Sequence, residues 1–162
     1  MEFMKIYICS DHGGFKLKEE LKGYLSELGF EVEDMGAHSL VDGDDYPDYV
    51  IPVALRVVSN RTSSPQGKLH ETLGVVIGRS GNGEVIAANK VKGVRAALCV
   101  SPEHAQKARS DNDANILSLG ADFMDAEVAR EVVKTFLETP FSDAERHARR
   151  VQKITDYENK SS

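Results

Sequence analysis

The sequence contains no tryptophan, only two cysteines, and no apolar run near the roughly 20 residues that a membrane-spanning helix requires. It has no excess of positive charge, because 20 Lys and Arg residues face 26 Asp and Glu residues, for a formal net charge of -6. This balance argues against a protein that coats nucleic acid or binds an anionic membrane. Cys9 and Cys99 lie in separate apolar runs and form no Cys-x-x-Cys motif, so we expect reduced thiols in a cytoplasmic protein.

What the sequence does contain is an ordinary globular composition, with 41% hydrophobic and 28% charged residues in a chain of 162. This length is typical of one domain, so we expect residues 1–162 to form a single domain. One polar stretch, residues 60–68, is too short for a domain linker and is expected to be a surface loop.

Short apolar runs alternate with segments of helical periodicity. Four runs are typical of strands buried on both faces, and a fifth alternates like a strand nearer an edge; in that order they are 6–9, 73–77, 94–99, 115–119 and 30–35. Helices are expected over 15–28 and 50–58, from near Val85, after the caps Ser101 and Asp125, and from a capping box at Ser142 and Glu145. The alternation predicts an α/β fold: an open, mostly parallel five-stranded sheet flanked by helices, with a C-terminal helix.

Two loops follow predicted strands at the edge where open parallel sheets bind ligands, residues 10–14 and 78–84. The second loop is rich in glycine and carries one hydroxyl, Ser80, and one carboxylate, Glu84. Backbone N–H groups in such a turn stabilise an oxyanion, and a carboxylate beside them is suited to remove a proton next to a carbonyl. The alternative is a tight strand-to-helix turn in which Glu84 only complements the helix dipole.

The same loop fits neither nucleotide-binding pattern. A Walker loop needs Lys and then Ser or Thr where the chain has Glu84 and Val85. The dinucleotide fingerprint needs a small residue three positions after Gly83, where the chain has Ile86. A nucleotide-dependent redox enzyme is therefore disfavoured.

Other candidate residues have a structural and a functional interpretation. Asp11 is either a helix cap satisfied by His12 or half of a titratable pair at the binding edge. Arg146 and Arg150 are four residues apart, so they either share a solvated helix face or hold a phosphate together. Tyr46 is expected to line a pocket, and the carboxylates around it are interpreted as solvated loop charges in place of a metal site: Asp42, Asp44, Asp45 and Asp48.

With these residues assembled, the chain resembles the type B ribose-5-phosphate isomerases, a family that also holds galactose-6-phosphate isomerase subunits. The resemblance covers nearly the whole chain in order, and the segment 83–95 is the most specific part of it. The stretches that carry it are 10–14, 45–48, 78–84, 86–91, Asn112 and 146–151.

The resemblance implies a Rossmann-like homodimer with active sites at the subunit interface and no metal or nucleotide cofactor. It implies an enzyme of sugar-phosphate metabolism in the pentose phosphate pathway that interconverts an aldose and a ketose through a cis-enediol. Glu84 would be the base, because Gly78 stands where another branch of the family has Cys. Ser80 and the backbone of Gly81, Asn82 and Gly83 would hold the reacting oxygens. The remaining substrate contacts would be Asp11, His12, Tyr46, Asn112 and the phosphate-binding Arg146 and Arg150.

Two positions depart from the family pattern. Asp111 stands where relatives usually have a His that opens the furanose ring, and Asp122 stands where they usually have a phosphate-binding Arg. An isomerase of ribose 5-phosphate or a close relative is therefore one expectation. A shorter substrate that closes no furanose ring, such as a tetrulose 4-phosphate, is another, and a non-catalytic sugar-phosphate binding module is a third.

Overall fold

The computed structural model of the chain describes residues 4–60 and 71–160. Most of the predicted polar loop 60–68 lies outside these residues. The described strands are β1 (Lys5–Ser10), β2 (Glu31–Asp34), β3 (Thr72–Gly78), β4 (Ala96–Leu98) and β5 (Ile116–Gly120). They form one parallel sheet in the order β2-β1-β3-β5-β4, so the predicted α/β sheet of five strands is confirmed.

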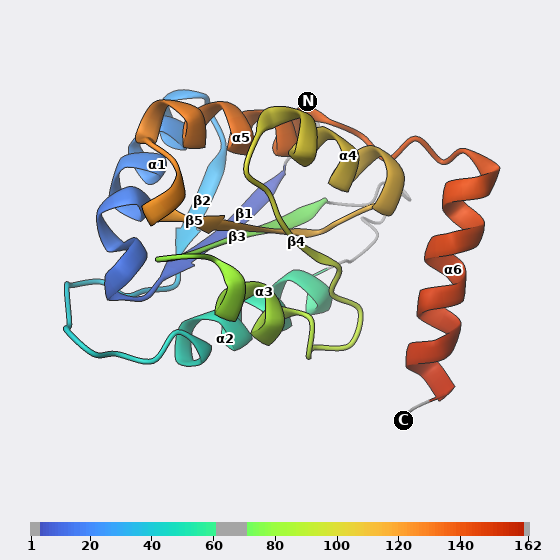
Figure 1. Cartoon of the computed structure of the whole chain (residues 1–162), viewed down its shortest axis with the longest axis horizontal. Helices are drawn as coiled ribbons and strands as arrows, with labels where there is room; N and C mark the ends of the chain where they lie inside the picture. The colour runs from blue at the N-terminus through green and yellow to red at the C-terminus, as the bar shows by residue number, and fades with distance from the viewer. Residues whose placement is uncertain (1–3, 61–70, 161–162) are drawn as a thin grey trace.

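Helices cover both faces of the sheet (Figure 1). On one face lie α1 (Phe15–Glu27), α4 (Pro102–Asn112) and α5 (Ala126–Glu138), and on the other lie α2 (Pro47–Ser59) and α3 (Asn82–Ala88). Two short 3-10 turns, η1 (His12–Gly14) and η2 (Ala121–Phe123), follow β1 and β5. Side chains alternate along each central strand, which gives the sheet one apolar core on each face.

The predicted caps of two helices are confirmed. The Ser101 hydroxyl accepts the backbone N–H of His104 at 3.2 Å, and the Asp125 carboxylate accepts that of Val128 at 2.9 Å. Pro102 follows Ser101 at the first position of α4, where a missing N–H costs no hydrogen bond.

Two predictions about local structure are wrong. The run 94–99 is not a strand buried on both faces, because β4 spans only Ala96–Leu98 at the sheet edge and is half-buried. The capping box at Ser142 does not form: Asp143 has a φ of 51°, and α6 (Glu145–Lys160) begins only at Glu145. The Ser142 hydroxyl instead lies 3.0 Å from Nδ1 of the buried His147.

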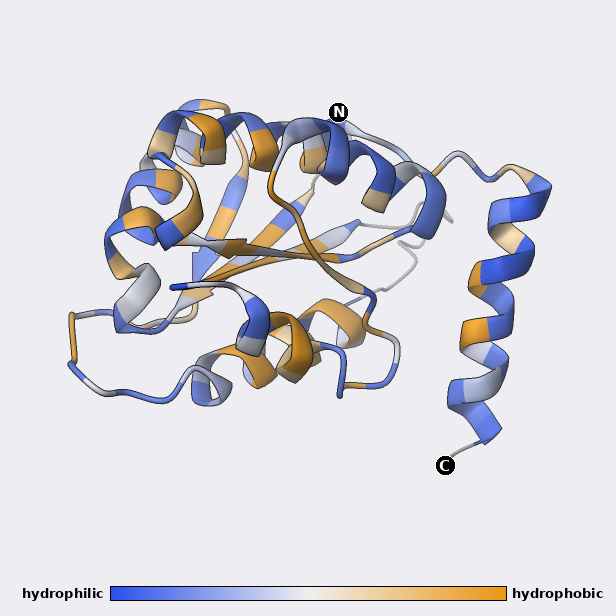
Figure 2. Cartoon of the chain, viewed as in Figure 1, coloured by the Kyte–Doolittle hydropathy of each residue, from blue (hydrophilic) through white to orange (hydrophobic). Residues whose placement is uncertain are grey.

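The C-terminal helix α6 lies at one side of the molecule, away from the loops that follow β1 and β3 (Figure 1). Its Glu158 carboxylate accepts the Gly93 N–H of the body at 2.9 Å. The surface of α6 is mostly hydrophilic, with a few apolar positions (Figure 2). Two of its large side chains, Ile154 and Tyr157, are 55% and 74% exposed.

Candidate active site

The two candidate loops lie side by side because β1 and β3 are neighbours. Ser10 and Ile77 are paired in register at the carboxyl ends of these strands, so the residues after them meet at one edge of the sheet. The Arg79 side chain crosses directly over Gly13, where a Cβ atom would overlap it. Glu84, Asp11 and His12 are thereby gathered at the carboxyl edge of β1 and β3.

The glycine-rich loop is held in place from β5. Gly81 has a φ of 80°, which favours glycine, and a Cβ there would lie 2.6 Å from the Leu98 side chain. The Ser118 hydroxyl donates to the Gly81 carbonyl at 2.8 Å, and the Ser80 hydroxyl accepts the Asn82 N–H at 3.2 Å. The turn into α3 is therefore fixed by contacts to backbone atoms before any ligand binds.

The Glu84 carboxylate lies directly against Gly78. A Cβ atom at position 78 would overlap it, so the carboxylate occupies the place that any side chain at that position would take. Glu84 is only 4% exposed. Burial raises its pKa, its own backbone N–H opposes that shift, and the charge of Asp11 raises it further. Glu84 is thus a carboxylate whose affinity for a proton is increased, as a general base requires.

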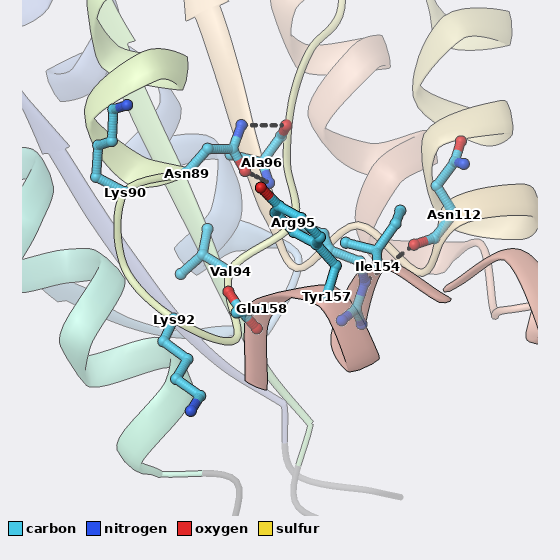
Figure 3. A pocket seen from close by; sticks show the side chains of 10 residues that line it. All are labelled: Asn89, Lys90, Lys92, Val94, Arg95, Ala96, Asn112, Ile154, Tyr157 and Glu158. Atoms are coloured by element: carbon cyan, nitrogen blue, oxygen red, sulfur yellow. Dashed lines mark hydrogen bonds between the residues drawn. The ribbon is translucent and has the colours of Figure 1, made fainter. Parts of the chain in front are cut away.

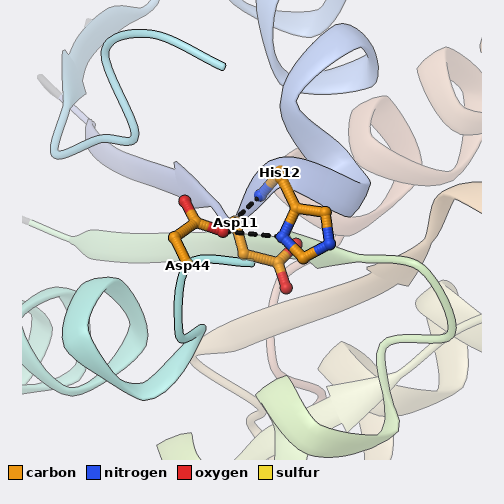
Figure 4. A group of neighbouring side chains, drawn as sticks. All are labelled: Asp11, His12 and Asp44. Atoms are coloured by element: carbon orange, nitrogen blue, oxygen red, sulfur yellow. Dashed lines mark hydrogen bonds and ion pairs between the residues drawn. The ribbon is translucent and has the colours of Figure 1, made fainter. Parts of the chain in front are cut away.

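Asp11 and His12 are arranged differently from a simple helix cap (Figure 4). The Asp11 carboxylate accepts the Gly13 N–H at 2.9 Å, as a cap does. His12 does not pair with Asp11 but with Asp44, whose Oδ1 atom accepts the His12 backbone N–H at 2.9 Å and lies 2.7 Å from its Nδ1. This hydrogen bond raises the pKa of His12.

Asp44 corrects one prediction. It is not a solvated loop charge, because its side chain is 8% exposed and holds His12 from a position 32 residues away in sequence. Ligand atoms of Asp11, His12 and Asp44 lie within 4.8 Å of one another, so this group could hold a metal ion. The hydrogen bonds of Asp44 to His12 already occupy two of these side chains, which favours a hydrogen-bonded pair.

Tyr46, which was predicted to line a pocket, packs onto the glycine-rich loop. It directly precedes α2, and a Cβ atom on Gly83 would lie 2.5 Å from its ring and 2.8 Å from its hydroxyl. The tyrosine therefore covers the first turn of α3 next to Glu84.

Three predicted substrate contacts lie elsewhere in the chain. Arg146 and Arg150 are exposed on α6, which stands away from the loops after β1 and β3. Asn112 ends α4 and lines a hollow of about 770 Å³ between α6 and the body of the molecule (Figure 3). The other lining residues are Asn89, Lys90, Lys92, Val94, Arg95, Ala96, Ile154, Tyr157 and Glu158. One chain alone does not bring Asn112, Arg146 and Arg150 to Glu84.

The two positions that depart from the family pattern lie at opposite ends of the sheet. Asp111, beside Asn112, accepts the Ser110 hydroxyl at 2.7 Å, and this bond holds the pKa of Asp111 below its usual value. Its Oδ1 atom lies 3.7 Å from Nδ1 of His147. Asp122 follows β5 at the carboxyl edge, where its Oδ2 atom lies 4.0 Å from Nη1 of Arg79.

Neither cysteine can act as a thiolate nucleophile. Both are free and buried, as predicted. Burial raises the pKa of Cys9 well above its usual value and that of Cys99 to about 12. No helix in residues 4–60 or 71–160 is long and apolar enough to cross a lipid bilayer.

Comparison with known proteins identifies the family. The model of the Ribose/Galactose Isomerase family matches residues 6–154. Ribose-5-phosphate isomerase B of Mycolicibacterium paratuberculosis is 42% identical over 155 residues, which are 96% of this chain and 92% of the relative.

Solved structures agree with this match. Ribose-5-phosphate isomerase B of Clostridium thermocellum is 43% identical and superposes with a TM-score of 0.88, covering 98% of this chain and 100% of its own. The enzyme of Mycoplasma genitalium, solved with bound ribulose-5-phosphate, is 38% identical with a TM-score of 0.89, covering 98% and 99%. The predicted fold and enzyme class are confirmed, and the chain belongs to the ribose/galactose isomerase family of aldose–ketose isomerases.

Proposed function

We propose that this chain interconverts ribose 5-phosphate, or a close relative, and the matching ketose through a cis-enediol with Glu84 as the base. The observation that carries the proposal is the buried Glu84 carboxylate, fixed against Gly78 beside the glycine-rich turn. Relatives named ribose-5-phosphate isomerase B, one with bound ribulose-5-phosphate, support the choice of substrate.

The proposed reaction moves one proton between adjacent carbons. Glu84 removes the proton from C2 of the open-chain aldose, the C–H electrons form the C1–C2 double bond, and the carbonyl oxygen takes up the charge. Ser80 and the backbone of Gly81, Asn82 and Gly83 hold the two oxygens of the enediolate. Transfer of the O2 proton to O1 and return of the proton from Glu84 to C1 give the ketose. No metal or other cofactor is required by this sequence of steps.

Asp11, His12 and Tyr46 are proposed to position the substrate. Asp11 lies at the same edge as Glu84 and has a carboxylate suited to accept a sugar hydroxyl, and Tyr46 lies against Gly83 beside Glu84. His12, kept in one orientation by Asp44, is suited to donate to a substrate oxygen.

The phosphate end of the substrate points to a homodimer. Asn112, Arg146 and Arg150 lie away from Glu84 in the same chain, and α6 leaves apolar side chains exposed beside a large hollow. We propose that the partner subunit's Asn112, Arg146 and Arg150 complete each site. In this proposal residues 1–162 are one cytoplasmic isomerase domain.

A test of the shared site mixes two inactive variants, Glu84→Gln and the double variant Arg146→Gln/Arg150→Gln. Each mixed dimer contains one intact site, so random exchange of subunits restores roughly a quarter of wild-type activity. Light scattering on the same samples reports the oligomeric state. Failure to regain activity on exchange of subunits would show that each site is built within one chain.

Two alternatives follow from Asp111 and Asp122. Asp111 is held as a carboxylate by Ser110, and such a group does not donate a proton to a ring oxygen as an imidazolium does. A tetrulose 4-phosphate, which closes no furanose ring, is therefore the second candidate substrate. A non-catalytic sugar-phosphate binding module is disfavoured by the intact arrangement of Glu84 and the glycine-rich loop.

Substrate identity is tested by measuring isomerisation of ribose 5-phosphate beside erythrulose 4-phosphate with wild type and Glu84→Gln. Turnover of the pentose ester that is lost in Glu84→Gln supports the first proposal. Turnover of the four-carbon ester alone assigns the shorter substrate. Binding of both esters without turnover supports the binding module.

A further inference from the structure

Arg79 is a cation beside the candidate site, and the proposed mechanism gives it no role. It lies between β3 and Ser80, at the start of the glycine-rich loop. Its side chain runs over Gly13, the residue after His12, where no Cβ atom would fit. The hydrogen bond to Asp44 raises the pKa of His12, and the positive charge of Arg79 lowers it. The guanidinium is therefore close enough to act on the imidazole.

The acidic neighbour of Arg79 at the carboxyl edge of the sheet is Asp122. The Asp122 N–H donates to the Arg79 carbonyl at 2.9 Å, which fixes the two residues beside each other through their backbones. Their side chains are 65% and 54% exposed and approach only to 4.0 Å. An ion pair this long and this exposed contributes little to stability, so it does not by itself account for an arginine here.

Carboxylates outnumber cations around Arg79, so a substrate phosphate at this edge needs a cation to bind it. Asp11, Asp44, Glu84 and Asp122 all lie at the carboxyl ends of the strands, and each repels a substrate phosphate. Asp122 and Gly13, with Lys16 and Glu20, line a hollow of about 310 Å³, so Asp122 faces space that a ligand can enter. Arg79 offers a planar set of N–H donors, which matches the oxygens of a phosphate.

We propose that Arg79 binds the phosphate of the sugar substrate, and that Asp122 moderates this contact by competing for the guanidinium. The proposal rests on the proposed function and deepens it, because it assigns a phosphate ligand from the same chain as Glu84. It also gives Asp122 a role at a position where a lone carboxylate would only repel the substrate.

The experiment compares Arg79→Gln, Arg79→Lys and Asp122→Asn with wild type, using whichever of the two sugar phosphates wild type turns over. Arg79→Gln removes a hydrogen bond between charged groups. We expect this loss to raise KM by about 10-fold or more, while kcat changes little. Arg79→Lys recovers part of this loss. Asp122→Asn lowers KM by roughly 2-fold or more, because it releases Arg79 from an exposed pair.

The matched control is Lys134→Gln, which removes one positive charge from an exposed position on α5 and leaves KM unchanged. Equal KM values for Arg79→Gln, Asp122→Asn and the control would overturn the proposal and leave Arg79 as a surface ion pair.

Calorimetric titration with inorganic phosphate separates this outcome from failure of the proposed function. Weaker phosphate binding by Arg79→Gln than by wild type supports the contact even if neither sugar phosphate is turned over. Equal phosphate binding refutes it whether or not wild type shows turnover that depends on Glu84.

Discussion

Gly78→Ala is the substitution that most directly perturbs the placement of the Glu84 carboxylate. The new methyl group would overlap the nearer carboxylate oxygen and lie 2.6 Å from the farther one, whereas ordinary contacts begin near 3.4 Å. Gly78 is paired with Gly120 inside the sheet, so its backbone cannot retreat without breaking β3 from β5. The nearer Glu84 oxygen must therefore move by more than about 1 Å, and a displacement of that size costs roughly 100-fold in kcat.

The matched control for this variant is Gly23→Ala on α1, where no atom lies within 4 Å of the new methyl group. Alanine is the better helix former, so this control raises the free energy of unfolding by up to about 1 kcal/mol and leaves kcat unchanged. Steady-state kinetics and urea unfolding of both variants make the comparison. A folded Gly78→Ala protein with wild-type kcat would refute the placement of Glu84 as the base.

Two further predictions concern charge. Asp34→Asn lowers the free energy of unfolding in urea at neutral pH by about 2 kcal/mol, since the fully buried Lys18 loses one of its two carboxylate partners at 2.7 Å and keeps only Glu19. Burial raises the pKa of Asp34, but its hydrogen bonds to the two lysines lower the pKa by more. Wild type therefore loses this stabilisation only as the pH falls through the lowered pKa. Asp11→Asn moves the acid limb of the pH profile of kcat/KM to lower pH, because the Asp11 charge no longer raises the pKa of Glu84. An unmoved limb would contradict this coupling.

Local patterns in the sequence predicted local structure well. Ser101 and Asp125 cap their helices because a cap depends on bonds to residues only three positions away. The prediction at Ser142 is wrong although the same pattern is present, because the left-handed conformation of Asp143 starts α6 later. β4 is half-buried because it lies at the edge of the sheet, and the order of the strands decides which strand is the edge. The apolar composition of β4 does not reveal that order.

The candidate site was predictable where topology brings strand ends together. Glu84, Asp11 and His12 follow neighbouring parallel strands, and the rule for open sheets gathers them. Asp44 was missed as the partner of His12 because 32 residues separate the two, and an acidic loop residue carries no mark of its contact. Arg146 and Arg150 have the spacing of a shared helix face, but spacing does not reveal that α6 lies away from the loops that follow β1 and β3.

The most direct test of the account is isomerisation in deuterated water by wild type and Glu84→Gln, followed by NMR of the product. Proton transfer through an enediol puts deuterium at the receiving carbon whenever the proton on Glu84 exchanges with solvent before it returns. Loss of the base predicts a fall in turnover of about 100-fold or more in Glu84→Gln, without loss of folding. Full turnover by Glu84→Gln would contradict the assignment of Glu84 as the base of an enediol isomerase.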